Sequence, residues 1–347
     1  MAIFPLNDTR CSTNEIPSIP EYLSASNKYG ITLVTAGTLA VIVVVAMFAD
    51  TFLYVMKNSS SKVKAHTAFV IGVYPVISLA TYFAILVPRS HLIAEAICQG
   101  MFMAGMYQLF CLFLAYCDGE AEVVRKVSPA KLSLKVTPLC CFPCCGILPE
   151  YKVTKKSVRI LRFMVLQLPI FQSLVYLVLI VMWAERESLY RINYLYIQPL
   201  IAISILIGIW AMSMLMNIIK TILSDKFIMG KFAVLQLVLL FAKFQGFFAR
   251  SLVWMDLLPC KPPITPAVYG NLLHNTLMLG EMVMLGALAR FLYKRKLPET
   301  VDVLTKITTI GSIMAEDIVN NNNNSKIVIN SEKQIMGYDN QACDIKL

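Results

Sequence analysis

Residues 31–56 read ITLVTAGTLAVIVVVAMFADTFLYVM, and Asp50 is the only charged side chain among them. The hydrocarbon core of a bilayer is roughly 30 Å thick, so a helix needs about 20 apolar residues to cross it. A helix packed on a soluble core would carry a polar stripe at the helical period, but this run is apolar nearly all the way round. The stretch therefore predicts a transmembrane helix.

Six more runs of this kind follow along the chain of 347 residues. Apolar residues make up 57% of the chain and charged residues 15%, whereas about 25% of residues are charged in ordinary globular proteins. The sequence thus predicts an all-α, polytopic membrane protein with seven transmembrane helices. We place them at about residues 31–56, 67–87, 94–117, 161–183, 193–219, 231–250 and 265–290.

Basic residues are concentrated in alternate connections between these segments. The richest connection is residues 118–160, whereas the connections on the opposite side carry few bases. Cytoplasmic loops of membrane proteins are enriched in lysine and arginine, so we expect the N-terminus outside and the C-terminus in the cytoplasm. This loop pattern accounts for the net charge of +10, and no nucleic-acid partner is expected.

Two terminal segments flank the seven-helix domain, which we place at residues 31–297. Residues 1–30 form an extracellular segment, in which Asn7, in the tripeptide Asn-Asp-Thr, is a candidate glycosylation site. Residues 298–347 form a cytoplasmic tail. A run of asparagines and then polar residues predicts that this tail is largely disordered from residue 320.

A cluster of four cysteines, Cys-Cys-Phe-Pro-Cys-Cys, lies in the connection of residues 118–160. Structural zinc sites usually join cysteine pairs from separated segments, and four thiolates within six residues would struggle to surround one ion. Cytoplasmic cysteines close to a membrane are common palmitate acceptors. We therefore favour lipidation, with inert thiols or a metal site as alternatives, for Cys140, Cys141, Cys144 and Cys145.

Three further cysteines lie on the expected outer side, namely Cys11, Cys98 and Cys260. An extracellular disulfide among them is one reading, in which Cys11 and Cys260 are the easier pair to join. Unpaired or buried thiols are the other.

The last predicted span carries a polar face. Asn271, His274, Asn275 and Glu281 fall within an arc of roughly 120° at 100° per residue. An ionisable group inside a membrane is a functional candidate by default. The arc is either a substrate-facing surface or a packing face held by interhelical hydrogen bonds.

Other polar side chains within spans are also candidates for a substrate path. Lys243 lies too deep to reach the interface easily, and Gln167 and Gln245 need partners or a wet cavity. An ion pair between Lys243 and Glu281 is open, because their expected depths differ by on the order of 9 Å at 1.5 Å per residue.

Several function classes lack their sequence signatures. The chain has no nucleotide-binding P-loop, no catalytic His-Glu-x-x-His or Gly-x-Ser-x-Gly pattern and only three histidines. We therefore expect no enzyme activity, no cofactor and no metal site. The motifs typical of rhodopsin-like receptors are absent as well.

A series of short motifs runs through the spans in a fixed order. It comprises Val73-Tyr74-Pro75-Val76-Ile77-Ser78, Asp118-Gly119-Glu120, the cysteine cluster with its prolines, Val165-Leu166-Gln167 and Glu281-Met282. In this order and spacing the chain resembles the organic solute transporter alpha-subunit family, which includes the transmembrane protein 184 group.

The resemblance implies a facilitative carrier in the plasma membrane for amphipathic organic anions, such as bile acids and steroid conjugates. It also implies a single-span beta-type partner subunit and a lipid-modified cysteine loop. The apolar spans imply contact with membrane lipid, and packing faces on several spans favour formation of a homo-oligomer. The alternative is a palmitoylated scaffold or trafficking factor that transports nothing.

Overall fold

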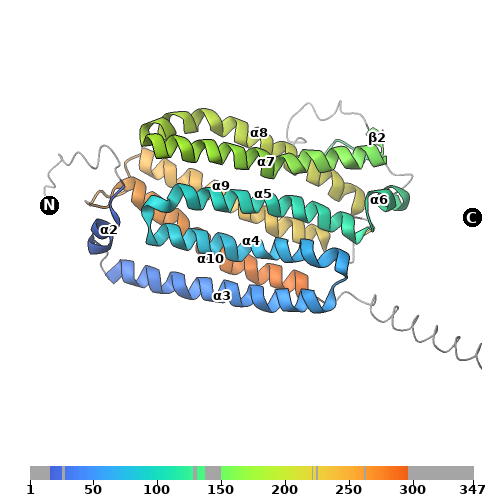
Figure 1. The fold of residues 1–347 in the computed structure, drawn as a ribbon, viewed down its shortest axis with the longest axis horizontal. Helices are drawn as coiled ribbons and strands as arrows, with labels where there is room; N and C mark the ends of the chain where they lie inside the picture. The colour runs from blue at the N-terminus through green and yellow to red at the C-terminus, as the bar shows by residue number, and fades with distance from the viewer. Residues whose placement is uncertain are drawn as a thin grey trace, which may run out of the picture. The chain divides into compact units, whose positions relative to one another are not determined.

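The computed structural model of the chain describes residues 16–25, 28–127, 131–136, 150–220, 222–223, 226–261 and 263–295. Seven long helices lie side by side with their axes roughly aligned (Figure 1), and each is long and apolar enough to cross a membrane. The predicted all-α class and the seven spans are confirmed. The helices are α3 (Lys28–Asn58), α4 (Ser61–Leu86), α5 (His91–Tyr116), α7 (Lys155–Glu185), α8 (Glu187–Ile219), α9 (Ile228–Trp254) and α10 (Pro266–Lys294).

Short elements mark the two ends of these helices. Helix α2 (Ile19–Ala25) lies at one end, hereafter the α2 end, and a single turn of 3-10 helix, η1 (Pro88–Ser90), joins α4 to α5. Helix α6 (Glu120–Val127) and the antiparallel pair β1 (Lys131–Ser133) and β2 (Glu150–Lys152) lie at the other end, the α6 end. Tyr22 of α2 donates a hydrogen bond to the carbonyl of Ile85 at 3.1 Å, which fastens α2 to the end of α4.

Most helices extend beyond the apolar runs that predict them. Helix α7 begins at Lys155 rather than at the predicted residue 161, because polar residues can continue a helix once it leaves the hydrocarbon. Thr154 caps this start, since its hydroxyl accepts a hydrogen bond from the Ser157 amide at 3.1 Å. The counting of apolar residues finds the membrane-crossing part of a helix and misses its polar ends.

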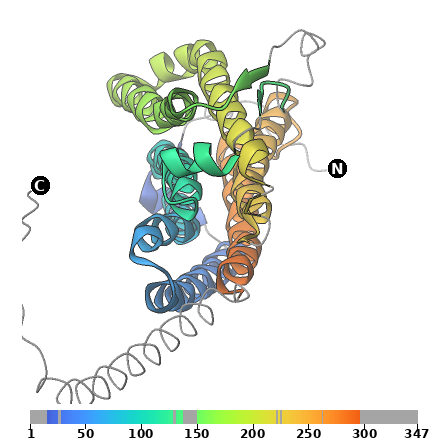
Figure 2. The same cartoon turned by 90° about the vertical axis from the view of Figure 1, so that its right-hand side faces the viewer.

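Helix α5 lies at the centre of the packed helices (Figure 2). It contacts α4 on one side and α7 on the other, whereas α8 packs mainly on α7 and α9 mainly on α10. Large side chains of its second half, including Phe110 and Phe113, are fully buried. The half of the bundle toward the α6 end therefore has a close-packed core.

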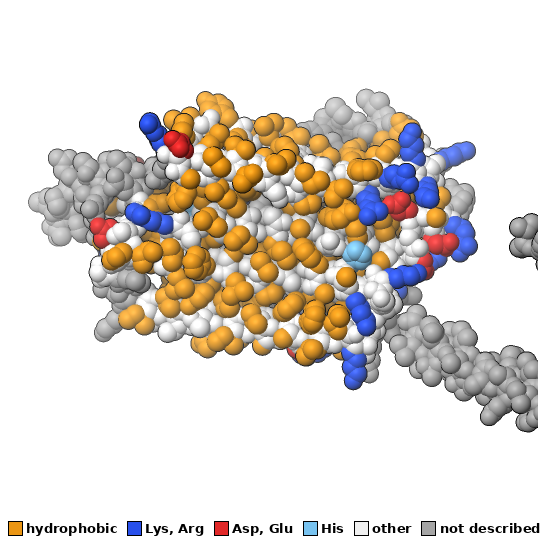
Figure 3. Space-filling model, viewed as in Figure 1, with side chains coloured by type: hydrophobic (Ala, Val, Ile, Leu, Met, Phe, Trp, Pro, Cys, Tyr) orange, Lys and Arg blue, Asp and Glu red, His pale blue; other side chains and the backbone are white. Residues whose placement is uncertain are grey.

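The molecular surface carries two kinds of side chain in separate zones. Hydrophobic side chains cover the middle of the helices, and lysine and arginine gather at the α6 end (Figure 3). Exposed large apolar residues occur on α3, α7, α8 and α9, as expected for helices in contact with lipid.

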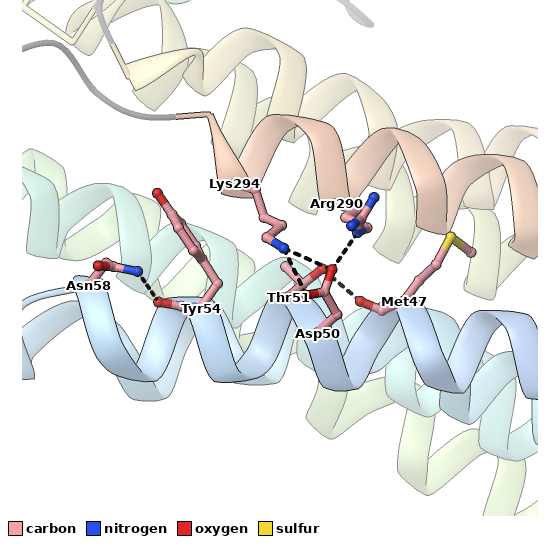
Figure 4. Close-up of polar contacts among 7 residues, drawn as sticks. All are labelled: Met47, Asp50, Thr51, Tyr54, Asn58, Arg290 and Lys294. Atoms are coloured by element: carbon pink, nitrogen blue, oxygen red, sulfur yellow. Dashed lines mark hydrogen bonds and ion pairs between the residues drawn. The ribbon is translucent and has the colours of Figure 1, made fainter.

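Asp50 belongs to a polar contact between α3 and α10 (Figure 4). Its carboxylate lies 2.7 Å from Nε of Arg290 and 2.8 Å from Nζ of Lys294. All three side chains are close to the α6 end of their helices, so this ion-pair cluster joins the first and last spans near the membrane edge.

The crossing of α7 and α8 requires a residue without a side chain at Gly208. A Cβ atom added there would lie 2.4 Å from Cδ1 of Leu168. We expect Gly208→Val to lower the free energy of unfolding by about 1–3 kcal/mol, the usual range for overpacking, and to lower the amount of folded protein. Thermal unfolding of the purified protein measures this, with Gly280→Val, where nothing lies within 4 Å, as the control. Equal losses at both positions would contradict the proposed close approach.

Candidate functional site

A cavity of about 840 Å³ lies between α4, α5, α8, α9 and α10, in the half of the helices toward the α2 end. Its wall contains apolar side chains, including Ile77, Phe102, Val238 and Met278. It also contains a set of polar side chains, hereafter the polar wall. Its charged and hydrogen-bonding members are His91, Glu95, Gln99, Tyr194, Gln198, Lys243, Arg250, Asp256, Asn271, His274 and Asn275.

The carboxylate of Glu95 is the centre of the polar wall. The hydroxyl groups of Tyr176 and Tyr194 donate to its Oε1 at 3.2 and 3.4 Å. Arg250 Nη2 lies 3.7 Å from Oε1, and His91 Nε2 lies 3.8 Å from Oε2. Groups from α5, α7, α8 and α9 therefore converge on one carboxylate, which holds four helices in register around the cavity.

Arg250 is also fixed by an aromatic ring. Its guanidinium carbon lies 4.6 Å from the centre of the Tyr194 ring, a distance at which cation and ring attract each other. Because Glu95 and Tyr194 both act on it, Arg250 is held at the cavity wall.

Lys243 is the second cation of the cavity, two turns along α9 from Arg250. Among the described residues no carboxylate lies within ion-pair distance of its amino group. A partly buried cation with no carboxylate in direct contact attracts the anionic group of a molecule that enters the cavity. Lys243 is therefore the group on this wall most available to a ligand.

Three other polar atoms of cavity-lining residues lack hydrogen-bond partners. Oε2 of Glu95, Nε2 of Gln99 and Nδ1 of His274 are buried and make no hydrogen bond within the described part of the chain. Buried polar groups are normally hydrogen-bonded. These atoms can be satisfied by a polar ligand or by water in the cavity.

The structure divides the candidates from the sequence into two groups. Lys243, Asn271, His274 and Asn275 line the cavity, and the amide of Asn275 donates to the backbone carbonyl of Asn271 at 2.8 Å. The other three candidates, Gln167, Gln245 and Glu281, are absent from its wall.

These three side chains make interhelical contacts instead. Gln167 of α7 and Ser204 of α8 exchange hydrogen bonds of 2.8 and 3.0 Å. Gln245 of α9 donates to the carboxylate of Glu281 of α10. Lys243 and Glu281 form no ion pair, because Gln245, the partner of Glu281, is two residues from Lys243 on α9 and therefore points from the opposite side of that helix.

Sequence reasoning missed the most connected residues of the cavity. His91, Glu95 and Arg250 lie at the ends of apolar runs, where charges are usually assigned to loops. The spacing of two of these residues could have revealed them, because His91 and Glu95 are four residues apart and therefore share a helix face. This spacing indicates that α5 begins before the apolar run does.

A smaller cavity of about 280 Å³ adjoins the first at the α2 end. His91, Tyr194, Arg250 and Asn271 belong to the walls of both. The remaining wall includes Arg89, Trp183 and Tyr190. The Glu95 cluster thus forms the partition between an outer vestibule and the main cavity.

Several candidate sites fall wholly or partly outside the described residues. Asn7, Cys11 and the cluster Cys140, Cys141, Cys144 and Cys145 all lie there, as does the tail from residue 298. Cys260 is disulfide-bonded, whereas Cys98 is a free thiol, so these two are not joined to each other. Within the described segments, no group of three or more potential ligands is arranged to hold a metal ion.

Comparison with known proteins gives a consistent result. A family model described as "Organic solute transporter Ostalpha" matches residues 32–297. An "Organic solute transporter alpha-like protein" of Drosophila melanogaster is 27% identical over 87% of this chain and 92% of its own length. An "Organic solute transporter subunit alpha" of Danio rerio is 24% identical over 91% of this chain and 98% of its own, and the one of Homo sapiens is 22% identical over 81% and 84%. No solved structure is significantly similar.

Proposed function

The chain belongs to the organic solute transporter alpha family, and from this premise we propose that it is a facilitative transporter subunit for amphipathic organic anions. Bile-acid-like anions and steroid conjugates are the solutes that fit best. The observation that carries the proposal is the cavity itself, whose wall combines apolar side chains with a lysine that has no carboxylate within ion-pair distance among the described residues.

The cavity suits a ligand with an anionic head and an apolar body. Its volume of about 840 Å³ lies within the range of about 300–1,000 Å³ typical of small-molecule sites. In the proposed complex, Lys243 binds the anionic group, and Phe102 and Met278 contact the apolar body. His274 and Gln99 hydrogen-bond to its remaining polar groups.

We propose that solutes also enter from the side, through the seam between α8 and α9. Phe247 and Trp254 both line the cavity, and yet 74% and 86% of their surface is exposed. On a transmembrane helix such surface faces lipid, so the cavity wall continues into the lipid-facing surface. An amphipathic solute already dissolved in the bilayer would reach Lys243 without crossing water.

The charge at the helix ends supports the orientation that we propose for the protein in the membrane. Lysine and arginine gather at the α6 end (Figure 3), which supports a cytoplasmic location for that end. The cavity and its vestibule would then face the outside, above the closed core around Phe110 and Phe113. We propose the plasma membrane as the location of the protein on the same ground as its solutes, namely membership of the organic solute transporter alpha family.

The proposed transporter has a partner. The zebrafish and human relatives are named "subunit alpha", which supports a single-span beta-type subunit packed against the lipid-facing surface. Homo-oligomers and palmitate on Cys140, Cys141, Cys144 and Cys145 are further parts of the proposal, as is a glycan on Asn7.

Bidirectional flux tests the proposed function. Cells expressing the chain, alone and with a single-span partner, are given a labelled steroid sulfate and a labelled bile acid. We expect saturable flux that follows an imposed gradient in either direction, as a facilitative carrier requires. No flux despite surface expression with the partner would overturn the proposal and favour the scaffold role.

A further inference from the structure

A second pocket, of about 540 Å³, lies at the α6 end, at the opposite end of α5 from the cavity. It is hereafter the basic pocket. Cys111 in its wall is 16 residues from Glu95, or about 24 Å along the helix at 1.5 Å per residue. It is therefore separate from the proposed solute site. Its polar wall consists of His66, Asp118, Glu120, Lys155, Arg159 and Arg162.

The two acids of the basic pocket already have basic partners. Asp118 lies 3.5 Å from Nζ of Lys62 and 3.6 Å from that of Lys126. Glu120 lies 3.2 Å from Nη1 of Arg162.

Lys155 and Arg159 are the two bases that remain. Both are exposed, and neither has an ion pair with any residue that the structure describes. His66 is occupied by a hydrogen bond of 2.7 Å to Gln108. With both acids neutralised, the pocket presents two uncompensated positive charges and attracts an anion.

The depth of Lys155 and Arg159 matches that of lipid headgroups. Helix α7 has 31 residues and is about 46 Å long, whereas the hydrocarbon core is roughly 30 Å thick. About five residues therefore project beyond the hydrocarbon at each end. On the side of the basic pocket these are residues 155–159.

An apolar stripe runs from Arg159 into the membrane zone. Phe163, Ile170, Leu174 and Leu177 are all exposed, and their spacings of 4, 7, 4 and 3 residues from Arg159 onward keep them on one face of α7. An acyl chain can lie along this face while its headgroup stays at Arg159. A water-soluble anion without an acyl chain would not contact these apolar side chains.

We infer that the basic pocket binds the headgroup of an anionic phospholipid, with Lys155 and Arg159 contacting the phosphate and α7 contacting an acyl chain. Basic pockets at the cytoplasmic ends of transmembrane helices suit such headgroups, and each nearby base adds about fivefold in affinity. The site is independent of solute transport.

The test uses the purified full-length chain in detergent micelles, with thermal unfolding as the measurement. Dioctanoyl phosphatidylserine, dioctanoyl phosphatidylcholine and inorganic phosphate are titrated separately. We expect a saturable rise in the unfolding midpoint with phosphatidylserine alone. In the variant Lys155→Gln/Arg159→Gln the affinity for this lipid should fall about 25-fold.

The control is Lys156→Gln, which removes another exposed base of α7 that does not line the pocket and should leave the affinity unchanged. An equal loss in Lys156→Gln would show diffuse surface charge and overturn the inference. Equal stabilisation by phosphatidylcholine or by inorganic phosphate would also overturn it. If the double variant does not fold, each single variant tests the same assignment with an expected loss of about fivefold.

Discussion

Replacing Lys243 with glutamine is expected to raise the apparent KM for a steroid sulfate by about 10- to 150-fold, the equivalent of a hydrogen bond to a charged group of about 1.5–3 kcal/mol. Lys243 lines the cavity and has no carboxylate partner among the described residues, so its charge is free for the solute. An uncharged steroid makes no such contact, and its transport should change little. Uptake of both compounds, normalised to surface protein, measures the difference.

Two controls separate recognition from damage to the fold. Lys220→Gln removes an exposed lysine at the end of α8, outside the cavity wall, and should leave both solutes unaffected. Lys243→Arg keeps the charge and should retain part of the uptake of the sulfate. If Lys243→Gln lowers uptake of the charged and the uncharged steroid equally, Lys243 does not recognise the anionic group.

Replacing Glu95 with alanine is expected to cause the largest loss of folded protein. Tyr176 is only 3% exposed and would lose the acceptor of its hydroxyl group, while Arg250 and His91 would lose the charge that they contact. A buried donor left without a partner costs about 1–3 kcal/mol. A change of this size alters the amount of a marginally stable protein several-fold, so surface expression should fall several-fold.

The matched variants are Glu95→Gln and Glu122→Ala. Glutamine keeps an acceptor for both tyrosines and should restore most of the expression. Glu122 forms an ion pair of 2.6 Å with Arg125 on the surface of α6, and exposed pairs contribute about 0–1 kcal/mol, so its removal should have little effect. Similar surface levels for Glu95→Ala and Glu122→Ala would contradict a structural role for the Glu95 cluster.

The seven helices are predictable from the sequence because membrane crossing imposes a length and an apolar composition that few other structures share. The apolar run of residues 31–56 is by itself sufficient to predict α3. The polar start of α7 and the short helices α2 and α6 were not found, since their residues look like loops. Their positions depend on contacts such as the hydrogen bond from Tyr22 to Ile85.

The candidate site is less predictable, because a helical arc gives the direction of a side chain but neither its depth nor its neighbour. His274 and Glu281 share a face of α10, yet they are seven residues apart, or about 10 Å along the axis. His274 lines the cavity, and Glu281 meets Gln245 of α9. The sequence alone does not show that Gln245 of α9 lies at the same depth in the bundle as Glu281.

Photolabelling tests the central claim most directly, namely that the cavity lined by Lys243 holds the solute. A steroid sulfate with a photoreactive group is bound to the purified protein, irradiated with and without excess unlabelled sulfate, and the adducts are located by mass spectrometry. The account predicts adducts, prevented by competition, on cavity-lining residues of α5, α9 and α10 such as Phe102, Phe247 and Met278. Adducts confined to the lipid-facing surface of α3, and unaffected by competitor, would contradict it.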